Sequence, residues 1–581
     1  MRKSFYHIAA LLIAALPAFT SCEDFLDKEA SNELTGKQTF SSWTTMEQFH
    51  IDTYNFLLSG ECRVGSSWLD AATDLAETSI ATSGARTGFN IGNYYSDAAA
   101  AELTSLWESR YRGIRKCNML LERIDSVPKA ADDSYELYET HKNWYKGEAR
   151  FMRAYFYWEL FLRYGPVPLV TKTLDPDGDL LTGYTERPSV KDYVVNFVIP
   201  EIKAAEQLVM DKASSDLAGY QGRINKDICR GMLTRIYLYM ASPRYSAESG
   251  ITWQDAADMC KSFIDDYGSH YRLMPDYGNA ILSTTFSQGN TETIFFRSDV
   301  SQGWSSYGFS TDTPVGEGGN GGNCPSQNLV DMYDMADGSA PFSSYDATGA
   351  PVYTNGTPSV DAASGYDDAH PFAGRDPRLK ATVLCNGDIW NGRAINVVAG
   401  MADNPRGNAN ATPTGYYMRK YMPEAILQNI HTGTAYRNWI IMRYAEVLLN
   451  YAEALSEANF TGNYATVCNI LDTIRHRAGI TGNVAERPDL ASPEAMRAFI
   501  HKERTVELAF EEHRPWDVRR WNVAVEALSR PVYGINVAAD GTCTRKVAQN
   551  RVFSERMYLY PIPETETWKT NIANNPGWGN N

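Results

Sequence analysis

Three aromatic residues stand close together in a stretch rich in glycine and serine. Trp304, Tyr307 and Phe309 are separated by only a few positions, and Asn320 follows them. The flat faces of such rings can dock on the apolar C–H patch of a pyranose, and side-chain amides can hydrogen-bond its hydroxyl groups. This combination predicts a carbohydrate-binding loop. The alternative is that the rings pack inward and hold their own loop in place.

A second group of similar residues lies in an early loop between predicted helices. It again combines aromatic rings with polar groups that can hydrogen-bond hydroxyls. The candidate ligand contacts of this loop are Trp68, Arg86, Asn90 and Tyr94, with Phe89 and Tyr95 beside them.

Motifs of the common catalytic, metal and nucleotide sites give no support for an enzyme. The nine histidines include no HExxH spacing, and the sequence contains no GxSxG element. Residues 316–321 satisfy GxGxxG, but no strand is predicted before them and no helix after them, as nucleotide binding would require. With 70 acidic residues some close carboxylate pair is inevitable, so a glycosidase pair cannot be identified. We therefore expect a non-enzymatic protein without metal or cofactor.

The elements that must position the candidate residues are mainly helices. Helical periodicity marks 43–58, 102–125, 138–163, 190–209, 225–241 and 253–267. Three more helices are predicted later: 438–458, about 465–478 ending at Gly479, and one that starts at Ser492 and runs to Pro515. Repeated helix pairs with Ala and Tyr at their contacts predict a mainly α, tetratricopeptide-like scaffold.

The last of these helices interleaves charge with apolar surface. Glu503, Glu507 and Glu511 are spaced one turn apart, and Arg504 lies on the same helix as the flanking aromatic residues. A ladder of solvated charges is one interpretation. We favour a buried ionic network that fixes how the final helices dock, because the flanking Phe and Trp would otherwise be left in water.

The chain can be divided into a leader, a tether and one large domain. Residues 43–283 and 434–530 form the predicted helical scaffold, and residues 531–581 form a closing segment with strand-like character. Residues 284–433 are rich in Gly, Asn, Asp, Ser and Pro, and short β-prone runs at 292–296 and 379–384 predict small hairpins. A long irregular insertion of this kind is usually functional, so it is the predicted ligand-binding region.

The N-terminus has the pattern of a lipoprotein signal peptide. Arg2 and Lys3 precede an apolar run, and residues 1–21 end in small residues directly before Cys22. We predict lipid on Cys22 and a tether over residues 22–42. The net charge of −16 argues against nucleic-acid binding. The other eight cysteines show no CxxC pair, which argues against a zinc site or a disulfide framework.

Several motifs together resemble the SusD/RagB family of outer-membrane nutrient-binding lipoproteins. They follow in order along the mature chain: CEDFLD (22–27), GEARFMRAYFYWELFLRYGPVPLV (147–170), PSQNLVDMYDMADG (325–338), GRDPRLKATVL (374–384), RYAEVLLNYAEAL (443–455), LDTIRHRAGI (471–480), KERTVELAFEEHRPWDVRRW (502–521), YLYPIPETE (558–566) and NNPGW (574–578). One departure is Glu512, where the family often has glycine.

The resemblance implies a fold, a location and a partner. It implies a SusD-like helical scaffold with a loop-built binding face, lipid-anchored to the outer membrane and facing the extracellular side. It also implies a lid over a SusC-like TonB-dependent transporter. Most members of the family bind glycans and some bind peptides. We therefore expect oligosaccharide or polysaccharide capture without catalysis, with peptide capture or a surface glycoside hydrolase as alternatives.

Overall fold

The computed structural model describes residues 36–60, 63–96, 102–103, 105–131, 133–175, 177–217, 219–282, 290–297, 302–303, 307–424, 434–435 and 437–579. The predicted signal peptide, the lipidation site Cys22 and the candidate residue Trp304 lie outside the described residues. Of the predicted tether, residues 36–42 are described. There α2 (Gly36–Thr39) forms one helical turn and Phe40 is buried, so the folded body begins before residue 43.

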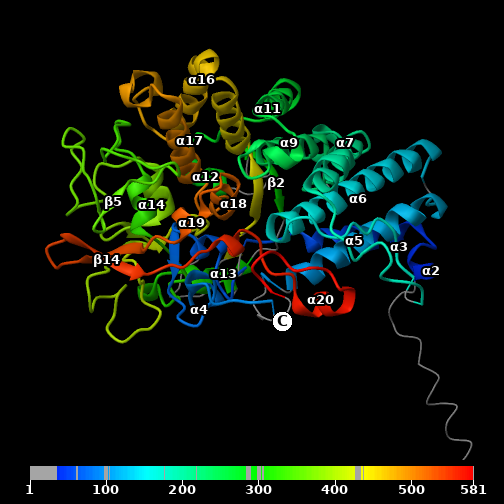
Figure 1. Cartoon of the computed structure of the whole chain (residues 1–581), viewed down its shortest axis with the longest axis horizontal. Helices are drawn as coiled ribbons and strands as arrows, with labels where there is room; N and C mark the ends of the chain where they lie inside the picture. The colour runs from blue at the N-terminus through cyan, green and yellow to red at the C-terminus, as the bar shows by residue number, and fades with distance from the viewer. Residues whose placement is uncertain are drawn as a thin grey trace, which may run out of the picture.

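Helices dominate the structure and follow the order that the periodicity predicts. They are α3 (Trp43–Ile51), α5 (Ser105–Arg123), α6 (Tyr135–Tyr164), α7 (Ile199–Glu206), α9 (Lys226–Ala241), α11 (Trp253–Tyr267), α16 (Tyr444–Arg477) and α17 (Pro493–Glu507). From α5 onward each packs against the next, and Figure 1 shows the series running from the right side to the top of the molecule. The predicted mainly α, tetratricopeptide-like fold class is confirmed.

Helix α6 shows how the sequence produces this packing. The Ser134 side chain caps its first turn by accepting a hydrogen bond from the backbone N–H of Leu137, and Gly165 ends it at φ 70°. Every side chain from Phe151 to Tyr164 is buried, as expected for a helix covered on all sides. Gly113 lets α5 approach closely, because a Cβ there would lie 2.6 Å from a ring carbon of Phe156.

The charged residues singled out in the sequence analysis are buried in α17 and the turn after it, as the favoured interpretation predicts. Glu503, Glu507 and Glu511 are at most 5% exposed, and Arg504 is 0% exposed. The Arg504 guanidinium donates to the Asp517 carboxylate at 2.7 Å. The interpretation as a solvated ladder of charges is therefore wrong.

Arg443 lies at the centre of this network. Its guanidinium donates to Glu507 and Glu511 at 2.7 Å each and to Glu292 at 2.6 Å. Arg378 reaches Glu507 from a separate helix, α15 (Arg378–Thr382), at 3.0 Å. Burial alone would raise the pKa of Glu507, but the surrounding arginines hold it below its ordinary value. Removing one member of such a network would leave a buried charge unpaired, so it fixes the docking of the elements that contribute to it.

The predicted helix over 438–458 begins later than expected. Residues Trp439–Arg443 form strand β12, which pairs antiparallel with β2 (Thr293–Arg297), because Ile440 and Ile441 suit a buried strand. Helix α16 starts at Tyr444, bends at Asn459 (φ −161°, ψ 84°) and continues through the predicted second helix. Gly479 follows at φ 95°, as predicted.

The third predicted helix ends earlier than Pro515. Helix α17 ends at Glu507, and Phe510 and Glu512 take positive φ values of 61° and 63° in the following turn. Pro515 then lies in the first turn of α18 (Arg514–Arg520). The prediction that Pro515 breaks a helix is wrong; proline is tolerated at a helix start, where its missing N–H has no intrahelical partner to lose.

The loop-rich region contains the predicted short hairpins, together with short helices that were not predicted, and its run at 292–296 pairs with the distant strand β12. Its strand pairs are β4 (Asn323–Pro325) with β1 (Ala76–Thr78), β5 (Tyr353–Thr354) with β6 (Thr357–Pro358), β7 (Val383–Leu384) with β10 (Tyr417–Met418), and β8 (Ile389–Trp390) with β9 (Arg393–Ala394). Residues 379–382 are helical in α15, so only the end of the β-prone run at 379–384 is a strand.

The closing segment forms its strands earlier than the sequence suggests. β13 (Val532–Val537) and β14 (Cys543–Gln549) form a hairpin. The strand-like run around 558–566 instead becomes a 3-10 turn, Glu555–Tyr558, and helix α20 (Glu564–Thr570). Pro561 and Pro563 lack the N–H groups that a strand ladder would need.

Seven cysteines fall within the described residues. All seven are free thiols and all are buried, and they belong to both the helices and the hairpins. Buried free cysteines of this kind pack as small core side chains.

The turn after α17 carries Glu512 at a position where the family that the sequence resembles often has glycine. Its backbone adopts φ 63°, which costs a side-chain-bearing residue about 1 kcal/mol. Its carboxylate accepts from Arg63 at 2.6 Å and from Arg163 at 3.0 Å. The ion pairs hold the residue in this conformation, since Arg163 is 0% exposed and needs its acidic partners.

We expect Glu512→Gly and Glu512→Ala both to unfold more easily than the wild type, because each leaves Arg63 and Arg163 short of a partner. The glycine variant should be the more stable of the two by about 1 kcal/mol, because it removes the strain of the positive φ. Urea unfolding of the three proteins measures the difference. If the alanine variant were as stable as the glycine variant, the turn would not be strained.

Asp70 is buried beside the turn that contains Glu512. Burial, reinforced by the charge of Glu512, raises the pKa of Asp70 from 3.8 to about 7. The folded state therefore favours the protonated carboxyl. The cost of ionising it is absent below about pH 3.8, grows as the pH rises, and is complete above about pH 7.

We expect Asp70→Asn, which cannot ionise, to raise the melting temperature at pH 8.5 and not at pH 4. The gain in unfolding free energy at high pH is about 4 kcal/mol at most. Melting curves of both proteins across the pH range test this. A stability difference that does not depend on pH would mean that Asp70 does not titrate in this window.

Candidate functional site

Two segments far apart in sequence lie side by side where the candidate loop residues gather. Gln549 donates its side-chain N–H to the Arg86 carbonyl at 3.1 Å. The backbone N–H of Val552 donates to Asn90 at 2.9 Å, and that of Glu564 donates to Ser96 at 3.1 Å. We call the surface formed by residues 79–96, 316–322 and 549–579 the loop face. Figure 1 shows α4 (Gly84–Thr87) and α20 along the lower edge of the molecule.

Three of the candidate residues in the early loop point inward. Trp68 is 2% exposed and packs edge-to-face against Tyr421 and Trp439. Asn90 is buried and donates to the Ala71 carbonyl at 3.1 Å. Tyr94 is 4% exposed. In this conformation these side chains hold the loop in shape and have no face open to a sugar, which corrects their placement as surface contacts.

The candidate residues Arg86 and Asn320 both hydrogen-bond the end of strand β1, which pairs with the distant strand β4. The Arg86 guanidinium donates to the Thr78 carbonyl at 3.4 Å, and the adjacent Ser79 hydroxyl donates to the Asn320 carbonyl at 2.5 Å. The Asn320 side chain is exposed and accepts from Asn410 at 3.2 Å. An exposed amide and a half-buried guanidinium near each other can hydrogen-bond a polyhydroxylated ligand.

One ring of the predicted aromatic cluster, that of Phe309, packs inside the protein. Phe309 is 1% exposed and lies in α13 (Tyr307–Asp312). The Arg437 guanidinium lies 5.3 Å from its ring centre and 5.0 Å from that of Trp68, and pairs with Asp312 at 2.6 Å. Phe309 therefore holds its own loop, the alternative stated for this cluster. Tyr307 begins α13, and Trp304 lies outside the described residues.

An open ring is present beside the predicted set, at Tyr95. Its side chain is 53% exposed, and the Arg556 guanidinium lies 5.7 Å from its ring centre. Arg556 also lies 4.3 Å from the ring of Trp578, whose indole N–H donates to the Arg556 carbonyl at 2.8 Å. A cavity of about 290 Å³ opens here, lined by Tyr95, Ser96, Arg556, Glu564, Gly577, Trp578 and Gly579.

This cavity has the chemistry expected of a sugar-binding site. Tyr95 offers an aromatic face, while Arg556 donates and Glu564 accepts hydrogen bonds. Ile91 and Val552, 42% and 51% exposed, extend the apolar surface next to it. Sequence reasoning included Tyr95 but missed Arg556, Glu564 and Trp578, because only the folded chain places residues near 95 beside residues near 570.

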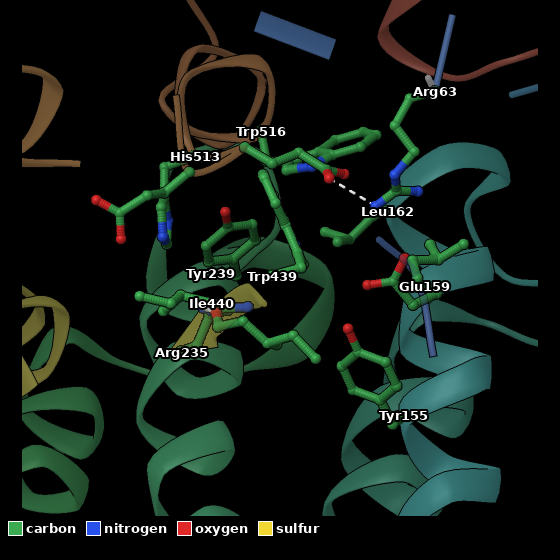
Figure 2. A pocket seen from close by; sticks show the side chains of 14 residues that line it. Arg63, Tyr155, Glu159, Leu162, Arg235, Tyr239, Trp439, Ile440, His513 and Trp516 are labelled. Carbon is green, nitrogen blue, oxygen red and sulfur yellow. Dashed lines mark hydrogen bonds and ion pairs between the residues drawn. The ribbon is translucent and has the colours of Figure 1, made fainter. Parts of the chain in front are cut away.

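A second, interior cavity can be excluded as a ligand site. It measures about 30 Å³ and lies between α6, α9 and the turn after α17. Figure 2 shows Arg63, Tyr155 and Glu159 pointing into it from one side and Arg235 and His513 from the other. Its volume suits one or two water molecules and no sugar.

Within the described residues there is no group of three or more His, Cys, Asp or Glu side chains that could hold a metal ion. None of the helices in the described part of the chain has an apolar stretch of the length and hydropathy that a membrane-spanning helix needs.

Comparison with known proteins matches two family models to the chain. The model described as the SusD family matches residues 291–578. The model described as "starch-binding associating with outer membrane" matches residues 24–238. A SusD-like protein of Formosa agariphila is 23% identical over 540 residues, which are 87% of this chain and 88% of the relative.

Solved structures agree in fold over almost the whole chain. A SusD-like protein from Bacteroides fragilis superposes with a TM-score of 0.75 at 24% identity, covering 95% of this chain and 100% of that one. A SusD-like carbohydrate-binding protein from the same species gives 0.70 at 24% identity, with 92% and 99% covered. A laminarin-binding SusD-like protein gives 0.58 at 22% identity, with 93% and 100% covered.

Proposed function

Because the chain belongs to the SusD family, we propose that it captures oligosaccharide or polysaccharide nutrients at the cell surface and passes them to a SusC-like TonB-dependent transporter. The observation that carries this proposal is the match of residues 24–238 to a family described as starch-binding and associated with the outer membrane. The match of residues 291–578 to the SusD family extends it across the loop-rich region.

The geometry of the loop face supports binding of a glycan. The exposed ring of Tyr95 can stack on the apolar face of a pyranose. Arg556 and Glu564 lie at the rim of the same cavity, where they can hydrogen-bond its hydroxyls. Two of the structural neighbours are themselves described as carbohydrate-binding and laminarin-binding.

Capture without bond cleavage is the second part of the proposal. The cavity brings together one carboxylate, Glu564, and one guanidinium, Arg556, among its lining residues. Glycoside hydrolysis of the usual kind needs two carboxylates on either side of the scissile bond. Delivery would then depend on differential affinity between the free protein and its complex with the transporter. A peptide ligand and a surface glycoside hydrolase are the alternatives.

We expect Tyr95→Ala to weaken binding of the best glycan ligand about tenfold, equivalent to about 1.4 kcal/mol, because the stacking face is lost. Calorimetry against starch, laminarin and other soluble glycans identifies that ligand and measures the change. The matched control is Tyr135→Ala, because Tyr135 is also exposed but begins α6, away from the loop face. Equal affinity in all three proteins would remove Tyr95 from the site, and the appearance of new reducing ends during the incubation would indicate an enzyme.

We further expect Cys22→Ala to move the protein from the outer-membrane fraction to the soluble fraction, because a multiply acylated cysteine is the proposed anchor. Fractionation and immunoblotting of the producing cells measure this. Cys543→Ala is the control, since that thiol is buried in the fold. Membrane retention of the Cys22 variant would contradict the anchor, while leaving glycan binding in solution untouched.

A further inference from the structure

A third cavity lies far from the loop face. It measures about 470 Å³ and lies between the loop at 339–345, the 3-10 turn Pro488–Leu490 and helix α17. We call it the α17 cavity. In Figure 1, α17 and β5 lie in the upper left part of the molecule, whereas α4 and α20 mark the loop face along the lower edge. Its volume falls within the range of small-molecule sites, about 300–1,000 Å³.

The walls of the α17 cavity are fixed without a ligand. Lys502 on its floor donates to Asp334 at 2.5 Å and lies 4.4 Å from the ring centre of Tyr345. Arg487, also in the lining, pairs with Asp489 at 2.7 Å and with the same Asp334 at 3.2 Å. The two cations of the lining are thus already held in ion pairs, so an anionic ligand would have to break an existing ion pair.

The space itself results from small side chains. Ala340, Ala495 and Ala498 line it where larger residues would fill it, and Pro488 and Leu490 add apolar surface. The cavity therefore has small apolar side chains beside the aromatic rings of Phe342, Tyr345 and Phe499. Such walls suit the C–H faces of a small polar ligand.

Hydrogen-bonding groups around this apolar surface remain available. The Ser344 hydroxyl has no hydrogen-bond partner among the described residues. One oxygen of Asp361 accepts from the Ala363 N–H at 2.9 Å and one oxygen of Glu486 accepts from Asn483 at 2.9 Å, which leaves the second oxygen of each carboxylate open within the described chain. These are mainly acceptors, and they match a ligand that donates several hydrogen bonds.

We propose that the α17 cavity is a second saccharide-binding site, which takes an uncharged sugar unit separately from the loop face. The paired cations disfavour an anionic ligand, and apolar walls combined with open carboxylate oxygens and a hydroxyl suit a polyol ring. The inference rests on the proposed glycan-binding function, to which it adds a second point of attachment. Two separated sites on one chain would raise the avidity for a long polysaccharide over that for a short one.

The test uses saturation-transfer NMR on the whole chain with a mixture of methyl β-glucoside, methyl β-galactoside, methyl α-mannoside and methyl β-N-acetylglucosaminide. We expect at least one glycoside to bind Tyr95→Ala protein, and this signal to be lost in the double variant Tyr95→Ala, Ala495→Trp, because tryptophan fills the α17 cavity. The matched control is Ala491→Trp, at an exposed position just before α17 that does not line the cavity.

A second variant keeps the test decisive if Ala495→Trp does not fold. Asp361→Asn changes a half-buried rim residue and should weaken the same glycoside about tenfold, because a hydrogen bond to a charged acceptor is lost.

Failure of the second site can be distinguished from failure of the proposed function. Glycoside binding that Tyr95→Ala abolishes would overturn the second site and leave glycan capture by the loop face intact. Binding that survives both Ala495→Trp and Asp361→Asn would also overturn it. If no glycoside or glycan bound any form of the protein, the second site and the proposed function would both fall. Binding of triglycine in place of the glycosides, lost on filling the cavity, would overturn the saccharide assignment.

Discussion

The ion pairs around Arg443 are the interaction on which the rest of this structure depends. Arg443 ends strand β12 and contacts Glu292 beside β2, Glu507 at the end of α17 and Glu511 in the following turn. It therefore ties the beginning of the loop-rich region to the second half of the helical scaffold. Burying so many charges adds little net stability compared with an apolar core, but it permits only one arrangement of the elements that supply them.

A frame fixed in this way allows the binding surface to be built from irregular segments. The loop face combines an early loop, a short turn from the loop-rich region and the closing segment, which are held together by single backbone hydrogen bonds such as that from Val552 to Asn90. None of these segments would hold its shape alone, because each contains only a short strand or a few helical turns. Their rigidity is derived from the helices beneath them.

The helices could be predicted from the sequence because their apolar periodicity is strong, and burial of Glu507 followed from the apolar residues around it. Strand β12 could not be predicted, because its short apolar segment continues directly into a helix of similar composition. The site was predicted less well. Trp68 and Tyr95 are both aromatic residues in the same loop, yet one is 2% and the other 53% exposed. Trp68 is covered by Tyr421 and Trp439, which lie hundreds of residues away in the sequence. Trp578, which lines the same cavity as Tyr95, is likewise far from it in the sequence.

The buried cysteines have a consequence for the surface location that we propose. Exposed thiols in an oxidising environment form disulfides or sulfenic acids through their thiolate form. Burial raises the pKa of Cys117 and of Cys324 to about 12 and that of Cys543 to about 11, so almost no thiolate forms at neutral pH. Burial thus disfavours oxidation of these thiols.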